Sequence, residues 1–279
     1  MDNLGFLYAI VAALAWGSYM VPFKRLGSSN PIYYQALMGL GVLLSGFLLT
    51  FLMGYSFNLN IAGIGSGFLW AFANIIFLSA ITNLGLSKAI PTTSSMVILT
   101  SFLWGSFVFG EISSNLLLAV LSIGLIIFGV CLVGSVGISQ SQNLKKGFSA
   151  AVLAGIIFGS QFTPVQITKV ETKDFFFAMA VGVFIATSVI MLVTKTKFEK
   201  ISKEGLFSGA LWNLGNLFGA MAISLIGLAK GLPITQLSVV VGVSWGILYF
   251  KEIKSAKNIM QISLGTIVFL LGVGLLSLA

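Results

Sequence analysis

The sequence contains no histidine, a single cysteine (Cys131) and few charged residues, which make up 8% of its 279 positions. The lack of histidine removes the commonest metal ligand and proton shuttle of proteins, and one cysteine cannot form a disulfide within the chain. Soluble domains carry about a quarter charged residues. This chain therefore has too little polar surface to cover a globule in water.

Sequence motifs for several reactions are also missing. The chain has no P-loop, no cluster of metal ligands and no Ser/His pair, so ATP-driven transport and intramembrane proteolysis lack their required residues. The net charge of +8 does not indicate nucleic-acid binding, because the basic residues fall in loops between apolar segments. We expect no enzyme activity, no metal, no cofactor and no nucleic-acid partner.

What the chain does contain is long apolar segments. Apolar residues make up 57% of the positions, and the mean hydropathy is +1.05. A helix needs about 20 apolar residues to cross a hydrocarbon core of roughly 30 Å, whereas membrane-barrel strands are about ten residues long and alternate in polarity. We predict an all-α membrane protein of ten transmembrane helices: residues 4–23, 32–52, 62–82, 87–108, 115–137, 147–168, 175–194, 206–227, 229–250 and 259–278.

The second half of the chain repeats the first at a spacing of 142 residues. The stretch 66–74, SGFLWAFAN, returns as 208–216, SGALWNLGN, and matched Lys, Pro, Trp-Gly and Glu positions follow in the same order. Apolar segments do not match by chance at tryptophan, asparagine, lysine, proline and glutamate together. A repeat of this length indicates a duplicated structural unit.

We predict one polytopic membrane domain, residues 1–279, made of repeat 1 (1–142) and repeat 2 (143–279). Each repeat holds five spans, an odd number, so the second enters the membrane from the opposite face. The sequence thus predicts two inverted five-helix repeats, which are typical of secondary transporters with a central site.

The basic residues predict how the chain sits in the bilayer. Alternating loops carry twelve Lys and Arg residues on one side and three on the other. Because loop Lys and Arg favour the cytoplasm, we predict a multi-pass protein of the cell membrane with both termini extracytoplasmic. The almost wholly apolar spans 115–137 and 259–278 are placed at the lipid-facing periphery, and a monomer and a homodimer both stay open.

A polar face repeats inside the predicted bundle. Trp70 and Asn74 are four residues apart and share a helix face, as do Trp212 and Asn216. Each tryptophan lies about 12 Å into its span at roughly 1.5 Å per residue, too deep for a headgroup belt. Two such faces would form a cup for a neutral polyol, with indole walls and amide hydrogen bonds. The alternative is that each Asn ties two helices together.

Further polar residues of neighbouring spans could line the same cup. The hydroxyl-rich turns after Pro91 and Pro233 suggest a polar passage, although helix–helix hydrogen bonds would explain them equally. The additional predicted solute ligands are Trp16, Ser18, Thr93, Gln161, Asn213, Thr235 and Gln236.

Four charged residues at span ends are candidate gates. We predict that Glu111 pairs with Lys230 at the outer side and Glu252 with Lys88 at the inner side; ordinary interfacial charges are the alternative. No charged residue lies in the middle of a predicted span, and such a charge normally marks ion or proton coupling. The solute is therefore expected to be uncharged, and proton coupling has no carrier beyond these glutamates.

Three short motifs resemble a known family. Gly-Ser before Pro22, GLSKAIP at 85–91 and WGSFVFGE at 104–111 are similar to the glucose/ribose porters of the drug/metabolite transporter superfamily. The resemblance covers essentially the whole chain. It implies a central cavity surrounded by spans 1–4 and 6–9, with spans 5 and 10 outside it, and sugar uptake that is often proton-coupled.

Together these features predict a secondary transporter that moves a small neutral polar solute, a monosaccharide such as glucose or ribose, by alternating access. Two alternatives stay open. One is an exporter of drugs, amino acids or other metabolites on the same fold. The other is a membrane-embedded partner subunit without transport activity.

Overall fold

The computed structural model describes residues 2–26, 30–84, 86–111, 115–135, 143–197, 202–250 and 255–279. Every regular element within these ranges is a helix, which confirms the predicted all-α class. The helices, including two π-helical turns, are α1 (Asp2–Ser18), α2 (Val21–Leu26), α3 (Pro31–Leu52), α4 (Ile61–Leu84), α5 (Leu86–Leu103), η1 (Trp104–Val108), α6 (Leu116–Gly134), α7 (Leu144–Gly159), α8 (Thr163–Thr168), α9 (Thr172–Val193), α10 (Lys203–Ile226), α11 (Leu228–Thr235), α12 (Ser238–Ser244), η2 (Trp245–Tyr249) and α13 (Ala256–Ser277).

Eight helical segments in the described part are long and apolar enough to cross a membrane. They are α1 with α2, α3, α4, α6, α7 with α8, α9, α10 and α13; a shorter apolar segment covers Leu228–Ser244. The predicted spans 87–108 and 229–250 correspond to α5 with η1 and to α11, α12 and η2. The membrane class is thus supported, whereas the number ten remains a prediction.

Local sequence explains where helices start and break. The side chains of Asn30, Asn115, Asn143 and Ser202 accept hydrogen bonds from backbone N–H groups in the first turns of α3, α6, α7 and α10, the usual stabilisation of a helix start. The breaks between α1 and α2 and between α7 and α8 are each followed by a proline, Pro22 and Pro164, in the first turn of the next helix. Proline is tolerated there because that N–H has no helical partner.

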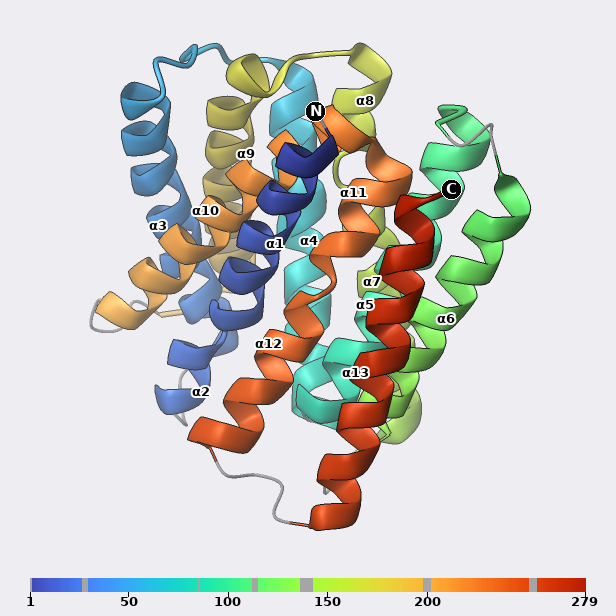
Figure 1. Ribbon diagram of the computed structural model, residues 1–279. Helices are drawn as coiled ribbons and strands as arrows, with labels where there is room; N and C mark the ends of the chain where they lie inside the picture. Colours follow the sequence, from blue (N-terminus) through green and yellow to red (C-terminus); the bar gives the residue numbers. More distant parts are fainter. Residues whose placement is uncertain are drawn as a thin grey trace.

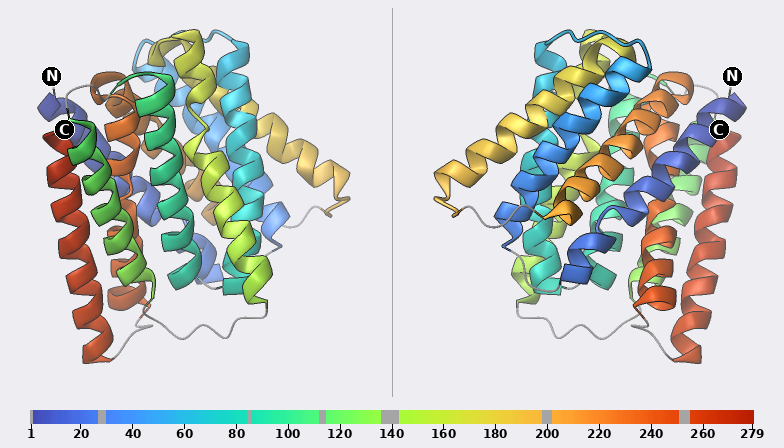
Figure 2. Two further views of the ribbon diagram at one scale, coloured as in Figure 1. Left: turned by 90° about the vertical axis from the view of Figure 1, so that its right-hand side faces the viewer. Right: turned by 90° about the vertical axis from the view of Figure 1, so that its left-hand side faces the viewer.

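The helices form one bundle with both chain termini at the same end (Figure 1). Helices α6 and α13 lie side by side along one edge of the bundle (Figure 2). Glycines bring these two helices together: a Cβ added to Gly129 would lie 2.5 Å from the Phe269 backbone nitrogen. The two predicted spans that are almost wholly apolar, 115–137 and 259–278, therefore correspond to helices that lie side by side at the edge.

The helices of the first and second halves interleave. Helix α4 packs against α7 and α9, and α10 packs against α1 and α3, so each half buries its surface mainly on the other. Gly67 of α4 faces the backbone carbonyl of Met179, and Gly209 of α10 faces that of Met38. Small residues allow such close helix approach in lipid, which explains glycine at both positions.

Replacing Gly209 by alanine is expected to destabilise the protein by about 1–3 kcal/mol, because the new methyl group meets the backbone of Met38 rather than a movable side chain. The melting temperature in detergent should fall by several degrees. Gly65→Ala on α4 is the matched control, since a Cβ at Gly65 meets nothing within 4 Å, and alanine is favoured over glycine in helices. Equal melting temperatures for the two variants would contradict this packing.

Candidate functional site

A cavity of about 120 Å³ lies in the bundle between α1, α4, α5, α7, α10, α11 and α12. Its volume is several times the ~10–15 Å³ needed for one water molecule. Six aromatic residues line it: Trp16, Tyr19, Trp70, Phe77, Phe158 and Trp212. The polar lining residues are Thr93, Ser94, Gln161, Gln236 and Ser238, and no Lys, Arg, Asp or Glu of the described chain is among the lining.

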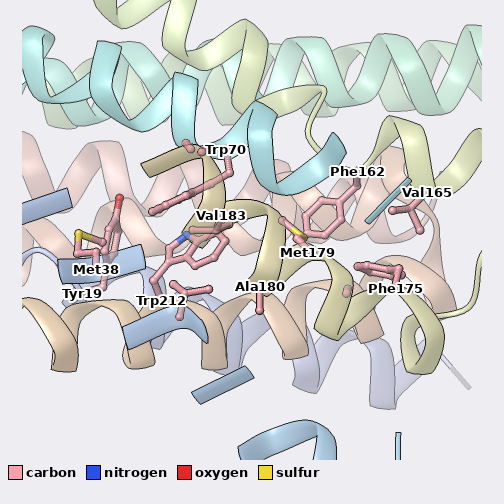
Figure 3. Close-up of a cluster of buried hydrophobic side chains, with 14 of the residues drawn as sticks. Tyr19, Met38, Trp70, Phe162, Val165, Phe175, Met179, Ala180, Val183 and Trp212 are labelled. Carbon is pink, nitrogen blue, oxygen red and sulfur yellow. The ribbon is translucent and has the colours of Figure 1, made fainter. Parts of the chain in front are cut away.

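The matched tryptophans meet at this cavity. The indole rings of Trp70 and Trp212 lie with their centroids 4.0 Å apart at an interplanar angle of 34°, and Figure 3 shows them facing each other within the buried hydrophobic cluster. Both side chains are almost fully buried. Two residues 142 positions apart in the sequence thus form one wall.

Trp16 forms a second part of the aromatic wall. Its Nε1–H donates a hydrogen bond of 3.1 Å to the backbone carbonyl of Trp212, and its ring lies against Gly215 and Gly219 of α10. Because this N–H is already bonded within the protein, Trp16 offers a solute only its ring.

The two amide side chains of the cavity lie where helices break. Gln161 lies between α7 and α8, and Gln236 lies between α11 and α12. Gln236 Nε2 donates a long 3.4 Å bond to Thr235 Oγ1, while Gln161 has no side-chain hydrogen bond to any described residue. Both amides retain hydrogen-bonding capacity for a ligand.

The structure therefore brings six predicted solute ligands to one cavity, namely Trp16, Trp70, Thr93, Gln161, Trp212 and Gln236. Thr93 Oγ1 also donates to the Ala151 carbonyl at 3.2 Å, so its hydroxyl joins α5 to α7 as well.

Three other predicted ligands lie outside the lining and form hydrogen bonds within the protein. Asn213 Nδ2 donates to Ser45 Oγ at 3.1 Å, which joins α10 to α3. Ser18 Oγ accepts a 2.9 Å hydrogen bond from Trp245 Nε1. Thr235 Oγ1 donates back to the Leu232 carbonyl at 2.6 Å.

The two matched asparagines are fully buried but are absent from the lining as well. Asn216 Nδ2 contacts Met179 Sδ at 3.4 Å. Neither amide atom of Asn74 has a hydrogen-bond partner within the described ranges. Their predicted role as solute ligands stays a prediction.

Lys230 and Glu111 are the predicted gate residues whose side chains are described, and Glu111 binds the start of a helix. Its Oε2 accepts a 2.7 Å hydrogen bond from the backbone N–H of Ala229, in the first turn of α11 and one residue before Lys230. The positive end of a helix stabilises a carboxylate there. Gly227, at φ +79°, lies against the same carboxylate. Among the described residues no ion pair joins Glu111 to Lys230. Glu252 and the side chain of Lys88 lie outside the described residues, so their pairing and the gating role of all four residues stay predictions.

Sequence reasoning missed two polar residues that its own repeat indicates. Tyr19 lies 142 positions before Gln161, and Ser94 lies 142 positions before Gln236. All four line the cavity. Applying the repeat spacing to each predicted ligand would therefore have found both.

The fold and the site define a class of protein: an all-α membrane protein whose helices line a cavity with aromatic walls and, among the described residues, no charged side chain. The family described as "Sugar transport protein" matches this chain over residues 7–279. The chain belongs to that family, in the glucose/ribose porter group, as its motifs predicted.

Relatives of similar length carry related names. A "Probable glucose uptake protein" of Staphylococcus aureus is 28% identical over 97% of both chains. A "Putative sugar uptake protein" of Bacillus anthracis is 24% identical over 99% of both chains. A crystal structure with a TM-score of 0.76 and 16% identity covers 100% of this chain and 98% of its own, which shows that the fold is shared.

Proposed function

We propose that this protein is a carrier that moves a neutral monosaccharide across the cell membrane by alternating access. The observation that carries the proposal is the cavity, whose described lining combines indole rings with amides and hydroxyls and includes no ionised side chain. Apolar walls with a few placed polar groups are typical of small-molecule sites. The sugar-uptake names of relatives that match almost the whole chain support the same solute class.

The proposed architecture is ten spans in two inverted five-helix repeats. Two hydrogen bonds support it: Trp104 Nε1 donates to Ser160 Oγ at 3.0 Å, and Trp245 Nε1 donates to Ser18 Oγ at 2.9 Å. Each bond links a π-helical turn of one half to the helix break of the other half. The two bonds are the same contact made twice, as a pseudo-two-fold axis requires.

Each of the two bundles that move in this mechanism is proposed to contain helices from both halves of the chain. Helices α4, α5, α7 and α9 form one set of packed neighbours, and α1, α3, α10 and α12 form another; α3 and α9 pack against each other where the two sets meet. The cavity lies between these two bundles, with lining residues from both. Rocking of one bundle against the other would expose the cavity to each side in turn.

The proposed orientation places the termini outside the cell. Basic residues lie on α2 and in the first turns of α7 and α13, at the end of the bundle away from the termini (Figures 1 and 2). The lining follows α12 toward that end as far as Gly242, whereas Glu111 joins η1 and α11 at the other end. The described conformation is therefore proposed to open toward the cytoplasm.

Counterflow into proteoliposomes tests the function. Purified protein should exchange a labelled monosaccharide saturably, and the same sugar should raise its melting temperature, because a ligand that binds only the folded state stabilises it by about 2.7 kcal/mol at 100 Kd. Exchange of amino acids but of no sugar would favour the exporter alternative. Exchange of neither would favour the partner-subunit alternative.

A further inference from the structure

We propose that Gly215 and Gly219 form a groove that positions Trp16 as the aromatic platform of the solute site, and that the depth of this groove limits the size of the sugar accepted. The groove is the surface of α10 at these two glycines. The inference rests on the proposed function for its sugar, but the placement of Trp16 has a readout of its own.

The contacts show how closely the ring fits. A Cβ built on Gly215 would lie 2.5 Å from Trp16 Cδ1 and 2.6 Å from its Nε1. A Cβ on Gly219, one helical turn later, would lie 2.9 Å from Cη2 at the far end of the ring. The indole therefore spans both glycines, and either methyl group would displace it.

Helix packing alone does not account for these two glycines. Gly209 of the same helix faces the backbone of Met38, so it allows two helices to approach. Gly215 and Gly219 face a side chain that lines the cavity instead. A glycine inside a helix lowers helix stability by about 1 kcal/mol relative to alanine. At these two positions the glycines make room for the Trp16 ring.

The opposite half of the site has no such groove. At the positions 142 residues away, Phe158 takes the place of Trp16, while Ala73 and Phe77 take the places of the glycines. Phe77 and Phe158 pack edge to face, with centroids 6.0 Å apart. The two halves of the site thus differ: Trp16 lies on two glycines in one, and Phe158 packs against Phe77 in the other.

The groove also determines what the platform can do. The hydrogen bond from Trp16 Nε1 to the Trp212 carbonyl holds the ring against α10. The apolar face of a sugar can stack on this ring, while its hydroxyls are left for Gln161 and Gln236 in the same cavity. Because α10 lies behind the ring, a methyl group in the groove must push the indole into the cavity.

The test compares Gly215→Ala with Gly65→Ala, a methyl group added where nothing lies within 4 Å. In counterflow, Gly215→Ala should raise the KM for a hexose about 10-fold and for a pentose about 3-fold or less, since the smaller solute needs less of the lost volume. Gly65→Ala should leave both values unchanged. Trp16→Phe combined with Gly215→Ala should bring the hexose-to-pentose ratio back toward the original. An equal increase in KM for the hexose and the pentose in a folded Gly215→Ala variant would overturn the proposal.

A second readout needs no sugar. In a Cys131→Ser background, a cysteine introduced by Ser238→Cys lies in the cavity and can be labelled with a small and a bulky methanethiosulfonate reagent. Gly215→Ala should lower the labelling rate of the bulky reagent more than that of the small one. Adding Trp16→Phe to the Gly215→Ala variant should restore the ratio of the two rates. Unchanged labelling would overturn the groove even if the protein transports sugar, whereas slowed labelling in a protein that exchanges no sugar would contradict only the proposed function. If Gly215→Ala does not fold, Gly219→Ala, with its wider 2.9 Å contact, serves the same comparison.

Discussion

Replacing both Gln161 and Gln236 by alanine is expected to lower monosaccharide uptake by about 10- to 100-fold, because each amide bond to a solute hydroxyl contributes about 0.5–1.5 kcal/mol. The melting temperature should change little. Gln161 makes no side-chain hydrogen bond to described residues, and Gln236 makes only the long one to Thr235. Loss of binding without loss of stability is the signature of a residue that serves the solute.

Asn213→Ala is the matched control for this double variant. Asn213 is a buried amide in the same bundle, but it donates to Ser45 and to the Val42 carbonyl rather than lining the cavity. Its removal should lower the melting temperature and leave the KM for the sugar nearly unchanged. Counterflow and thermal unfolding measured on both variants decide the matter. A folded glutamine double variant with normal uptake would mean that the solute binds elsewhere.

Replacing Glu111 by alanine is expected to slow transport by about 10-fold or more. The change removes the acceptor of the Ala229 N–H, and an unpaired buried donor costs about 1–3 kcal/mol. Since about 1.4 kcal/mol is a tenfold change in an equilibrium constant, this loss is large enough to redistribute the carrier between its two conformations. The conformation that is closed at the end bearing the termini should become the less populated one.

Side-specific labelling measures this shift. A membrane-impermeant maleimide should react with the cysteine introduced by Ser238→Cys faster from the terminal side once Glu111 is alanine. Glu171→Ala is the control, because Glu171 is an acid at the same end whose exposed ion pair with Lys173, at 2.8 Å, contributes about 0–1 kcal/mol. Identical labelling from both sides in the Glu111 variant and the unchanged protein would show that this contact does not hold the end closed.

The sequence predicted the helical spans and the meeting of Trp70 with Trp212. Hydropathy and the internal repeat can both be read directly from the order of residues along the chain. The sequence could not predict which residues one turn away would reach the cavity. Trp212 lines the cavity while the adjacent Asn213 contacts α3 and Asn216 contacts α9. Helical spacing tells which residues share a face, but the neighbour opposite that face is set by the packing of the whole bundle.

Two further features were beyond sequence pattern for the same reason. Trp245 donates a hydrogen bond to Ser18, and Trp16 packs on Gly215. Each contact joins residues roughly 200 positions apart in the sequence. Glu111 was predicted to find a lysine, yet the structure places its carboxylate at a backbone N–H. A helix start offers the same positive potential without a charged side chain, and only the fold shows which helix start lies within reach.

The interleaving of the two halves has a consequence for biosynthesis. Helix α4 finds its packing surfaces on α7 and α9, which leave the ribosome long after it. At a synthesis rate of about 5–20 residues per second, the first half waits on the order of ten seconds in the bilayer before its partners exist. During that time the polar groups of α4 that are buried in the finished fold, such as Ser66 and Asn74, face lipid or other transient neighbours. The packing surface of α4 is therefore completed only after most of the second half has been inserted.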